Sequence, residues 1–230
     1  MNRGIQHIFS DVAQAYELVN HVLTFGLDVL CRRKAAKLAA DGGGTRWLDV
    51  CCGTGEMAIC LRRIADDNTM IAATDFCFPM IRKAAQKPEA SQIVFTLADA
   101  QALPFRDMTF DLITLSFATR NINVSRVALL QCVGEFYRIL KPGGRFVSLE
   151  TSQPPSRFVR RLFHIYVRLV VERVGHIISG SRAGYAYLSR TIPRFYGADE
   201  LANIIRQAGF AEVTFDSMFS GLAAIHKAVK

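Results

Sequence analysis

Several features are missing from this 230-residue sequence, and each absence excludes a class of protein. No stretch reaches the roughly 18 uncharged apolar residues of a membrane-spanning helix. Residues 1–11 lack the apolar core of a secretory signal, so we expect a cytoplasmic protein. The six cysteines include the adjacent pair Cys51 and Cys52 but no C-x-x-C spacing. This excludes the commonest zinc and redox motifs and predicts free thiols and no metal.

The segment Cys51-Cys52-Gly53-Thr54-Gly55 also lacks what a phosphate-binding loop requires. The dinucleotide pattern G-x-G-x-x-G needs a third glycine, but position 58 is alanine. The G-x-x-x-x-G-K pattern of nucleoside triphosphate loops is absent as well. Binding of a pyrophosphate is therefore disfavoured. Taken alone, the segment is also compatible with an ordinary tight turn between a strand and a helix.

The composition is that of a globular protein with a strong positive charge. Half of the residues are hydrophobic, the net charge is +8 and the isoelectric point is about 9.4. The length predicts one domain over residues 1–230. The charge is compatible with nucleic acid, anionic lipid or an anionic substrate as a partner, and equally with a basic protein that binds none of them.

Strand-like and helix-like patterns alternate after Gly42-Gly43-Gly44. This rhythm predicts βαβ units and a mainly parallel sheet, closed by an antiparallel C-terminal hairpin. Helices are expected over residues 5–40, as a pair inside an N-terminal cap (1–42), and in an insertion over 155–197 that precedes the last helix. The expected strands are Trp47–Cys51, Thr69–Thr74, Ile93–Leu97, Phe110–Ser116, Arg145–Glu150, Glu212–Phe215 and Gly221–Lys227.

Acidic residues follow two of the strands that come after the glycine loop. Asp75 stands about 20 residues beyond that loop, and Asp99-Ala100 follows the next strand. A carboxylate at the first position can accept both hydroxyls of a ribose, and the second position can hold an adenine. Each aspartate by itself is equally compatible with a capping or solvated residue. Together with the glycine loop they favour an adenosine ligand without phosphate.

Three segments resemble motifs of the class I S-adenosylmethionine (SAM) methyltransferases. These are the glycine-loop strand, the fourth predicted strand and the turn before the fifth. They read Leu48-Asp49-Val50-Cys51-Cys52-Gly53-Thr54-Gly55, Phe110-Asp111-Leu112-Ile113 and Leu140-Lys141-Pro142-Gly143-Gly144-Arg145. The resemblance implies a Rossmann-like, seven-stranded α/β fold and SAM as cofactor.

Further segments at both ends of the chain resemble the ubiquinone/menaquinone biosynthesis C-methyltransferases. They are Tyr16-Glu17-Leu18-Val19-Asn20, Leu23-Thr24-Phe25-Gly26-Leu27, Ser116-Phe117-Ala118-Thr119-Arg120-Asn121, Leu149-Glu150-Thr151-Ser152-Gln153-Pro154, Ala208-Gly209-Phe210 and Gly221-Leu222-Ala223-Ala224-Ile225-His226-Lys227. The chain departs from the family at Glu17, where aspartate is usual, at Asp28, where histidine is common, and at Ala118-Thr119, which replaces Gly-Leu.

The resemblance assigns roles to two groups of residues. The first group would bind SAM: Asp49, Gly53, Thr54, Gly55, Asp75, Phe76, Asp99, Ala100 and Ser116. The second group would act on the acceptor: Arg120 stabilises a developing phenolate, Asn121 orients a ring oxygen, and Tyr16 contributes a hydroxyl. Their structural alternatives are a salt bridge for Arg120, a turn for Asn121 and core packing for Tyr16.

The implied reaction is methyl transfer from SAM to a ring carbon of a polyprenyl quinol of the demethylmenaquinol type, in menaquinone or ubiquinone biosynthesis. Two other enzymes remain open: a methyltransferase for another lipophilic acceptor, such as a phenol or sterol, and a nucleic-acid methyltransferase. The last alternative is an inactive SAM-binding protein. We expect no nucleic-acid partner, because a basic stripe with spaced aromatics is not evident outside the insertion.

The insertion mixes arginines with large apolar residues over 157–171. A basic amphipathic helix of this kind can lie on an anionic membrane surface, at the inner face of the membrane. It can equally roof a substrate channel or simply cover the sheet. We therefore allow for peripheral membrane contact, and also for a homodimer.

Overall fold

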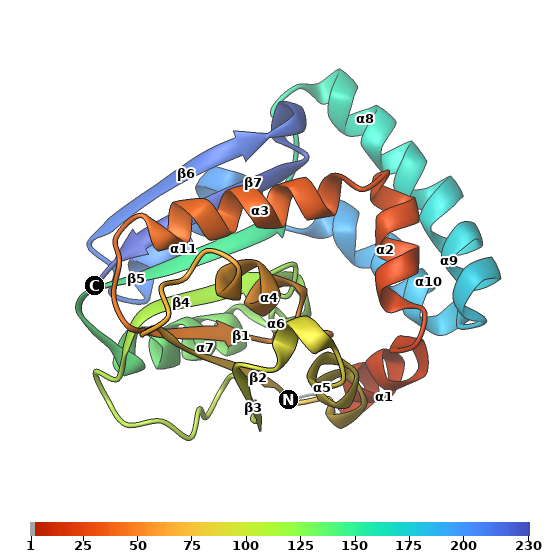
Figure 1. The fold of residues 1–230 in the computed structure, drawn as a ribbon. Helices are drawn as coiled ribbons and strands as arrows, with labels where there is room; N and C mark the ends of the chain where they lie inside the picture. The colour runs from red at the N-terminus through yellow and green to blue at the C-terminus, as the bar shows by residue number, and fades with distance from the viewer. Residues whose placement is uncertain (1–2) are drawn as a thin grey trace.

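The computed structural model describes residues 3–230, apart from the side chains of residues 3–5, 7, 8, 182 and 183. Its centre is a seven-stranded sheet in the order β3-β2-β1-β4-β5-β7-β6 (Figure 1). The strands are β1 Arg46–Val50, β2 Met70–Asp75, β3 Ile93–Leu97, β4 Phe110–Ser116, β5 Leu140–Thr151, β6 Glu212–Met218 and β7 Ala223–Val229.

The first five strands pair in parallel, whereas β7 pairs antiparallel with both β5 and β6. The sequence prediction of a mostly parallel sheet with an antiparallel C-terminal hairpin is therefore confirmed. The strand order reverses between β1 and β4, and the carboxyl ends of these strands flank the position where open α/β sheets bind ligands.

Helices cover both faces of the sheet because its central strands are apolar on both sides. On one face lie α3 (Leu27–Ala40) and α4 (Glu56–Arg62), which enclose Trp47. On the other face lie α7 (Arg126–Ile139) and α11 (Ala198–Gln207), which pack on the side of Leu48 and Val50. The remaining elements are α5 Phe78–Ala85, η1 Pro88–Ala90, α6 Thr119–Ile122 and η4 Phe219–Gly221.

The N-terminal cap contains three helices, so the prediction of two was wrong. The helices are α1 (Arg3–Val12), α2 (Tyr16–Thr24) and α3. The break between α2 and α3 lies at Gly26, which has a left-handed φ of 75°. The break after Val12 has no glycine or proline to announce it. Val12 and Ala13 are buried beside Met80 of α5, so tertiary packing sets that boundary.

The insertion is helical, as predicted. It consists of α8 (Arg157–Tyr166), the π-helical turn η2 (Val167–Val171), α9 (Glu172–Ser179), α10 (Arg182–Thr191) and η3 (Ile192–Arg194). The insertion and the cap meet, because α2 contacts α9 and α1 contacts α10 (Figure 1). Among the described residues, no helix combines the length and the apolarity that a membrane crossing needs.

Candidate active site

The loop between β1 and α4 is shaped by residues with left-handed backbone conformations. Gly53 and Gly55 have φ values of 54° and 82°, and Cys51 has a φ of 54°. A side chain at Gly55 would also meet the Cβ of Ala84 at 3.0 Å. Glycine at position 55 is therefore required by both conformation and space, which brings the loop close to α5.

This loop forms one wall of a cavity at the carboxyl ends of β1, β2 and β4, here called the cofactor cavity. Six of the predicted cofactor residues line it: Asp49, Gly53, Thr54, Asp75, Phe76 and Ser116. The walls also contain residues that the sequence did not single out: Phe9, Arg32, Cys52, Glu56, Met57, Met80 and Phe117. Tyr16 and Asn121, which were predicted to act on the acceptor, belong to these walls too.

Three predicted cofactor residues lie outside the cofactor cavity. Gly55, at the end of the loop, faces Ala84 of α5 and does not line the cavity. Asp99 follows β3 and accepts a hydrogen bond from the backbone N–H of Gln101 at 2.9 Å, as in a turn. Ala100 is buried in the core below α7. The structure therefore does not bring Asp99 and Ala100 into the walls with Asp75.

Two of the three acidic residues in the walls of the cofactor cavity, Asp49 and Asp75, are deeply buried. Burial raises the pKa of Asp49 to about 7, although the Thr114 hydroxyl donates to it at 2.7 Å. Burial likewise raises the pKa of Asp75 to about 6, against backbone N–H groups of Cys77 and Gly53 at 2.8 and 2.9 Å. Such groups gain from a ligand that supplies further hydrogen-bond donors.

Other polar atoms in the same walls lack partners. Within the described part of the chain, Asp49 Oδ2, Ser116 Oγ and Asn121 Oδ1 are buried without a hydrogen-bond partner. Unsatisfied buried oxygens are costly, and each can accept from a ligand donor. The ammonium, ribose hydroxyl and adenine amino groups of SAM are such donors, so these residues fit that cofactor.

A second cavity adjoins the first and is here called the central cavity. It has a volume of about 140 Å³ and shares Tyr16, Arg32 and Phe117 with the cofactor cavity. Phe117 follows β4 with a φ of 55°, a strained conformation for a bulky residue. Arg120 lines the central cavity, whereas Asn121, its neighbour on α6, faces the cofactor cavity instead.

Arg120 forms a salt bridge, which was the structural alternative to a role in catalysis, and it also has one donor nitrogen without a partner among the described residues. Its Nη1 donates to Thr151 Oγ1 at 3.0 Å and lies 3.5 Å from Glu150 Oε1. Arg120 is 8% exposed and Glu150 is 1% exposed, so this ion pair is buried. The Arg120 Nε, however, is buried without a partner among the described residues. The guanidinium thus holds its salt bridge while one of its N–H donors has no partner among the described residues.

Tyr16 lies at the boundary of both cavities. Burial raises its pKa, against the lowering effect of Arg32 and Arg120. The hydroxyl therefore stays protonated at neutral pH and can act as a hydrogen-bond donor. The Phe9 ring packs edge-on against Tyr16 at a centroid distance of 6.0 Å. Tyr16 is thus both a packed residue and a polar wall of the site.

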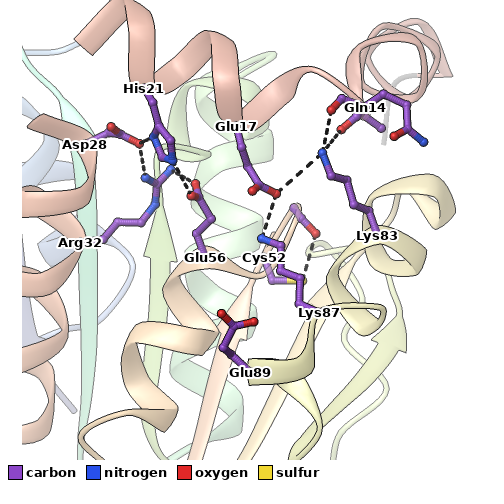
Figure 2. A network of polar contacts seen from close by, with 12 residues as sticks. Gln14, Glu17, His21, Asp28, Arg32, Cys52, Glu56, Lys83, Lys87 and Glu89 are labelled. Atoms are coloured by element: carbon purple, nitrogen blue, oxygen red, sulfur yellow. Dashed lines mark hydrogen bonds and ion pairs between the residues drawn. The ribbon is translucent and has the colours of Figure 1, made fainter. Parts of the chain in front are cut away.

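Arg32 is a site residue that the sequence reasoning missed. It is 6% exposed and pairs with Asp28 at 2.6 Å and with Glu56 at 3.1 Å (Figure 2). Its guanidinium also lies 5.2 Å from the centroid of the Phe117 ring. The spacing of four residues between Asp28 and Arg32 was a readable helical ion-pair signal.

His21 joins the same cluster, here called the polar cluster (His21, Asp28, Arg32 and Glu56). Its Nδ1 lies 2.8 Å from Asp28 and its Nε2 lies 3.3 Å from Glu56 (Figure 2). The histidine and the two carboxylates have their ligand atoms within 4.8 Å of one another, as metal ligands do. Arg32, however, pairs with both carboxylates, so a guanidinium is the cation of this cluster.

A second set of ion pairs holds α2 against α5. Glu17 lies 2.8 Å from Lys87 and 3.9 Å from Lys83, and Lys83 also donates to the backbone oxygen of Gln14 at 2.7 Å (Figure 2). Burial raises the Glu17 pKa, but Lys87, Thr54 and Lys83 together outweigh it and the net pKa is lowered. At position 17 the resembled family usually has aspartate. In this chain Glu17 forms ion pairs with Lys83 and Lys87.

The third cavity is almost entirely apolar and is here called the apolar groove. It has a volume of about 400 Å³ and runs between the cap, the insertion and the start of β7. It shares seven residues with the central cavity: Leu23, Thr24, Asp28, Phe117, Thr151, Phe163 and Tyr166. The central cavity therefore shares walls with both the cofactor cavity and the apolar groove, and Phe117 lines all three.

Solved structures identify the fold. A SAM-dependent methyltransferase from Thermotoga maritima, described as a possible histamine N-methyltransferase, covers 97% of this chain and 99% of its own with a TM-score of 0.68 and 20% identity. The cyclase SpnF also shares the fold, with a TM-score of 0.59 and 21% identity over 86% of this chain and 81% of its own. The fold alone therefore does not name the reaction.

Sequence relatives are more informative. A demethylmenaquinone methyltransferase of Thermus thermophilus is 38% identical over 95% of this chain and 98% of its own length. A ubiquinone/menaquinone biosynthesis C-methyltransferase of Desulfotalea psychrophila is 34% identical over 99% of this chain and 90% of its own. The family model matches residues 1–230. The chain therefore belongs to the ubiE/COQ5 methyltransferase family, and is a SAM-dependent methyltransferase as its sequence predicted.

Proposed function

We propose that the protein transfers the methyl group of SAM to a ring carbon of a polyprenyl quinol in menaquinone or ubiquinone biosynthesis. The observation that carries this proposal is that three cavities of different polarity share walls. A polar compartment suits the cofactor, a small compartment with two arginines suits a hydroxylated ring, and an apolar groove suits a prenyl chain. The names of the relatives agree with this acceptor.

SAM supplies an electrophilic methyl group when it is bound. The residues of the central cavity then act on the acceptor ring. Arg120 donates through its free Nε to the ring oxygen and stabilises the negative charge that develops there. Tyr16 donates a second hydrogen bond. Asn121 is better suited to hold the cofactor than the ring, because its unpartnered oxygen belongs to the cofactor cavity.

The test is methyl transfer from deuterated SAM to a panel of chemically reduced demethylnaphthoquinols and demethylbenzoquinols, analysed by mass spectrometry. We expect a ring-methylated product and none from the oxidised quinones, because an oxidised ring is electron-poor. The panel also determines which ring the enzyme prefers. Methylation of RNA with no methylation of any quinol would refute the proposal.

The apolar groove is proposed to hold the prenyl chain. Leu162 of α8 lines the groove, whereas Leu169 does not, and the two have similar exposed fractions of 51% and 52%. They therefore form a matched pair. In detergent micelles, Leu162→Asp should raise the KM for a long-chain quinol about tenfold but not that for a chain-free quinol. Leu169→Asp should change neither. Equal effects of the two variants would exclude the groove as the prenyl site.

The outer side of α8 is proposed to contact an anionic membrane. Arg157 and Arg161 of α8 are exposed, as are Arg168 of the following turn η2 and Phe158, which is 72% exposed. Arg160 is unsuitable for a test because it donates to the backbone oxygen of Pro154 at 2.9 Å. Replacing Arg157 and Arg161 by glutamine should weaken binding to vesicles with anionic lipids roughly thirtyfold, given about 1 kcal/mol per basic residue. Unchanged vesicle binding would exclude this surface.

The alternative acceptor is another lipophilic hydroxylated ring, such as a phenol or sterol. The central cavity and the apolar groove fit that class too, and the same panel extended with these compounds distinguishes it. A nucleic acid is disfavoured as the acceptor, because the apolar groove beside the central cavity would face its charged phosphates. An inactive SAM-binding protein is disfavoured by the free donor on Arg120. A homodimer stays a prediction, which sedimentation of the purified protein tests.

A further inference from the structure

Methylation of a ring carbon releases one proton, so the central cavity must contain a group that takes it. The ionisable side chains in its walls are Tyr16, Tyr166, Asp28, Arg32 and Arg120. Arginine does not give up its proton. Burial raises the pKa of both tyrosines, so they are protonated as well. Asp28 is therefore the only carboxylate among the described residues that line this cavity.

Asp28 connects the central cavity with the protein surface. It is 3% exposed and accepts from Thr24 Oγ1 at 2.7 Å. Its other oxygen is shared by Arg32 Nη1 at 2.6 Å and His21 Nδ1 at 2.8 Å (Figure 2). The His21 side chain is 37% exposed. An aspartate that faces a buried cavity thus contacts a histidine that reaches solvent.

We propose that Asp28 and His21 form the proton path of the methyl transfer: Asp28 accepts the hydroxyl proton of the acceptor, and His21 carries it to solvent. This inference rests on the proposed function, because it requires a hydroxylated ring in the central cavity. Asp28 is then a catalytic residue that touches the acceptor, and His21 acts through Asp28.

The bonds and protons balance in two steps. The hydroxyl proton moves to Asp28 while the ring carbon uses its electron pair to bond the methyl carbon; the carbon–sulfur bond breaks and its electron pair stays on sulfur. The ring is then a ketone with both hydrogen and methyl on one carbon. That hydrogen leaves as a proton, the ketone oxygen regains a proton, and the ring becomes aromatic. One proton in total leaves through His21.

The charges around Asp28 favour a group that passes a proton on over one that keeps it. Burial raises the pKa of Asp28, but Thr24, Arg32 and His21 outweigh it and the net pKa is lowered. Asp28 therefore passes a proton on and does not keep it. The His21 ring can take that proton on Nδ1, which contacts Asp28, and release one from Nε2. The resulting imidazolium lies between Asp28 and Glu56, with Arg32 as the other charged neighbour.

The competing interpretation is that Asp28 only holds Arg32 in place. The first experiment therefore measures the single-turnover rate with saturating SAM and a reduced short-chain demethylnaphthoquinol. Asp28→Asn should lower this rate by about 10²–10⁴, the usual contribution of a general base. Asp216→Asn, which removes the exposed ion pair with Lys34 and lies outside the three cavities, should change it less than about threefold. A rate for Asp28→Asn within threefold of wild type would overturn the proposal.

The second experiment removes the imidazole and restores it from solution. His21→Gly should transfer methyl slowly, and added imidazoles should rescue it because the position is open to solvent. The rescued rate should rise with the basicity of the added imidazole. A merely structural role predicts rescue that is independent of basicity. Rescue of that kind would contradict the relay.

A binding measurement needs no turnover. The quinol donates a hydrogen bond to Asp28, whereas its dimethyl ether has no O–H donor. Wild type should bind the quinol about tenfold more tightly than the ether, and Asp28→Asn should lose this preference. Equal preferences in both proteins would refute the contact. If wild type methylates no quinol at all, the proposed function fails and the relay with it; if wild type is active and both variants match it, only the relay fails.

Discussion

Asp49 should destabilise the protein at neutral and alkaline pH. It is completely buried in β1, with one oxygen bonded to the Thr114 hydroxyl and the other without a partner among the described residues. Replacing Asp49 by asparagine removes the charge and keeps the shape. The amide can still accept from Thr114. We therefore expect Asp49→Asn to unfold at a higher denaturant concentration than wild type at pH 8.

The size of the effect follows from the pKa. Burial raises the pKa of Asp49 from 3.8 to about 7. The folded state thus favours the neutral acid, and this advantage is complete below pH 3.8 and is lost as the pH rises to 7. At about 1.4 kcal/mol per unit, ionisation costs about 4 kcal/mol above pH 7. The stability difference between Asp49→Asn and wild type should therefore grow by about 1.4 kcal/mol per pH unit up to pH 7 and then level off.

The assay is urea denaturation of both proteins, followed by circular dichroism at pH 5, 6, 7 and 8. All other titrating groups are shared, so their effects cancel in the difference between the two proteins. SAM should stabilise wild type more than the variant at pH 8, since its donors offset the buried charge. A stability difference that stays constant across this pH range would refute the reasoning, because it would mean that Asp49 does not titrate between pH 5 and 7.

Three further predictions concern single contacts. Arg120→Met should destabilise the protein by about 3 kcal/mol in urea melts, because it leaves Glu150 buried and unpaired. The double variant Arg120→Met with Glu150→Gln should regain most of the stability but not the methyl transfer. Gly55→Ala should abolish SAM binding in calorimetry, because the new side chain would be 3.0 Å from Ala84 and would strain a φ of 82°; binding within twofold of wild type would contradict this. Ser125→Ala should cost about 1 kcal/mol, because Ser125 caps α7, while the turnover of the folded enzyme stays unchanged.

Local sequence determined the fold and the polar strand ends. The glycines at 53 and 55, the apolar strand that precedes them and the acidic residue at the end of β2 were readable because backbone conformation depends mainly on near neighbours. Ser125, a residue type that favours helix starts, is the N-cap of α7 and accepts from the backbone N–H of Ala128. The parallel pairing of β1 to β5 was predictable from the alternation of strand and helix, because βαβ connections give parallel strands.

Tertiary structure decided which side chains meet. Arg32, Glu56 and His21 come from three different helices, and no spacing in the sequence places all three beside the cofactor cavity. Asp99 and Ala100 do not line the cofactor cavity with Asp75, although the sequence predicted all three to bind the cofactor. The physical reason is that a side chain's neighbours across a cavity depend on how distant helices pack. The sequence therefore indicated a methyltransferase, and only the packed structure linked Asp28 through His21 to solvent.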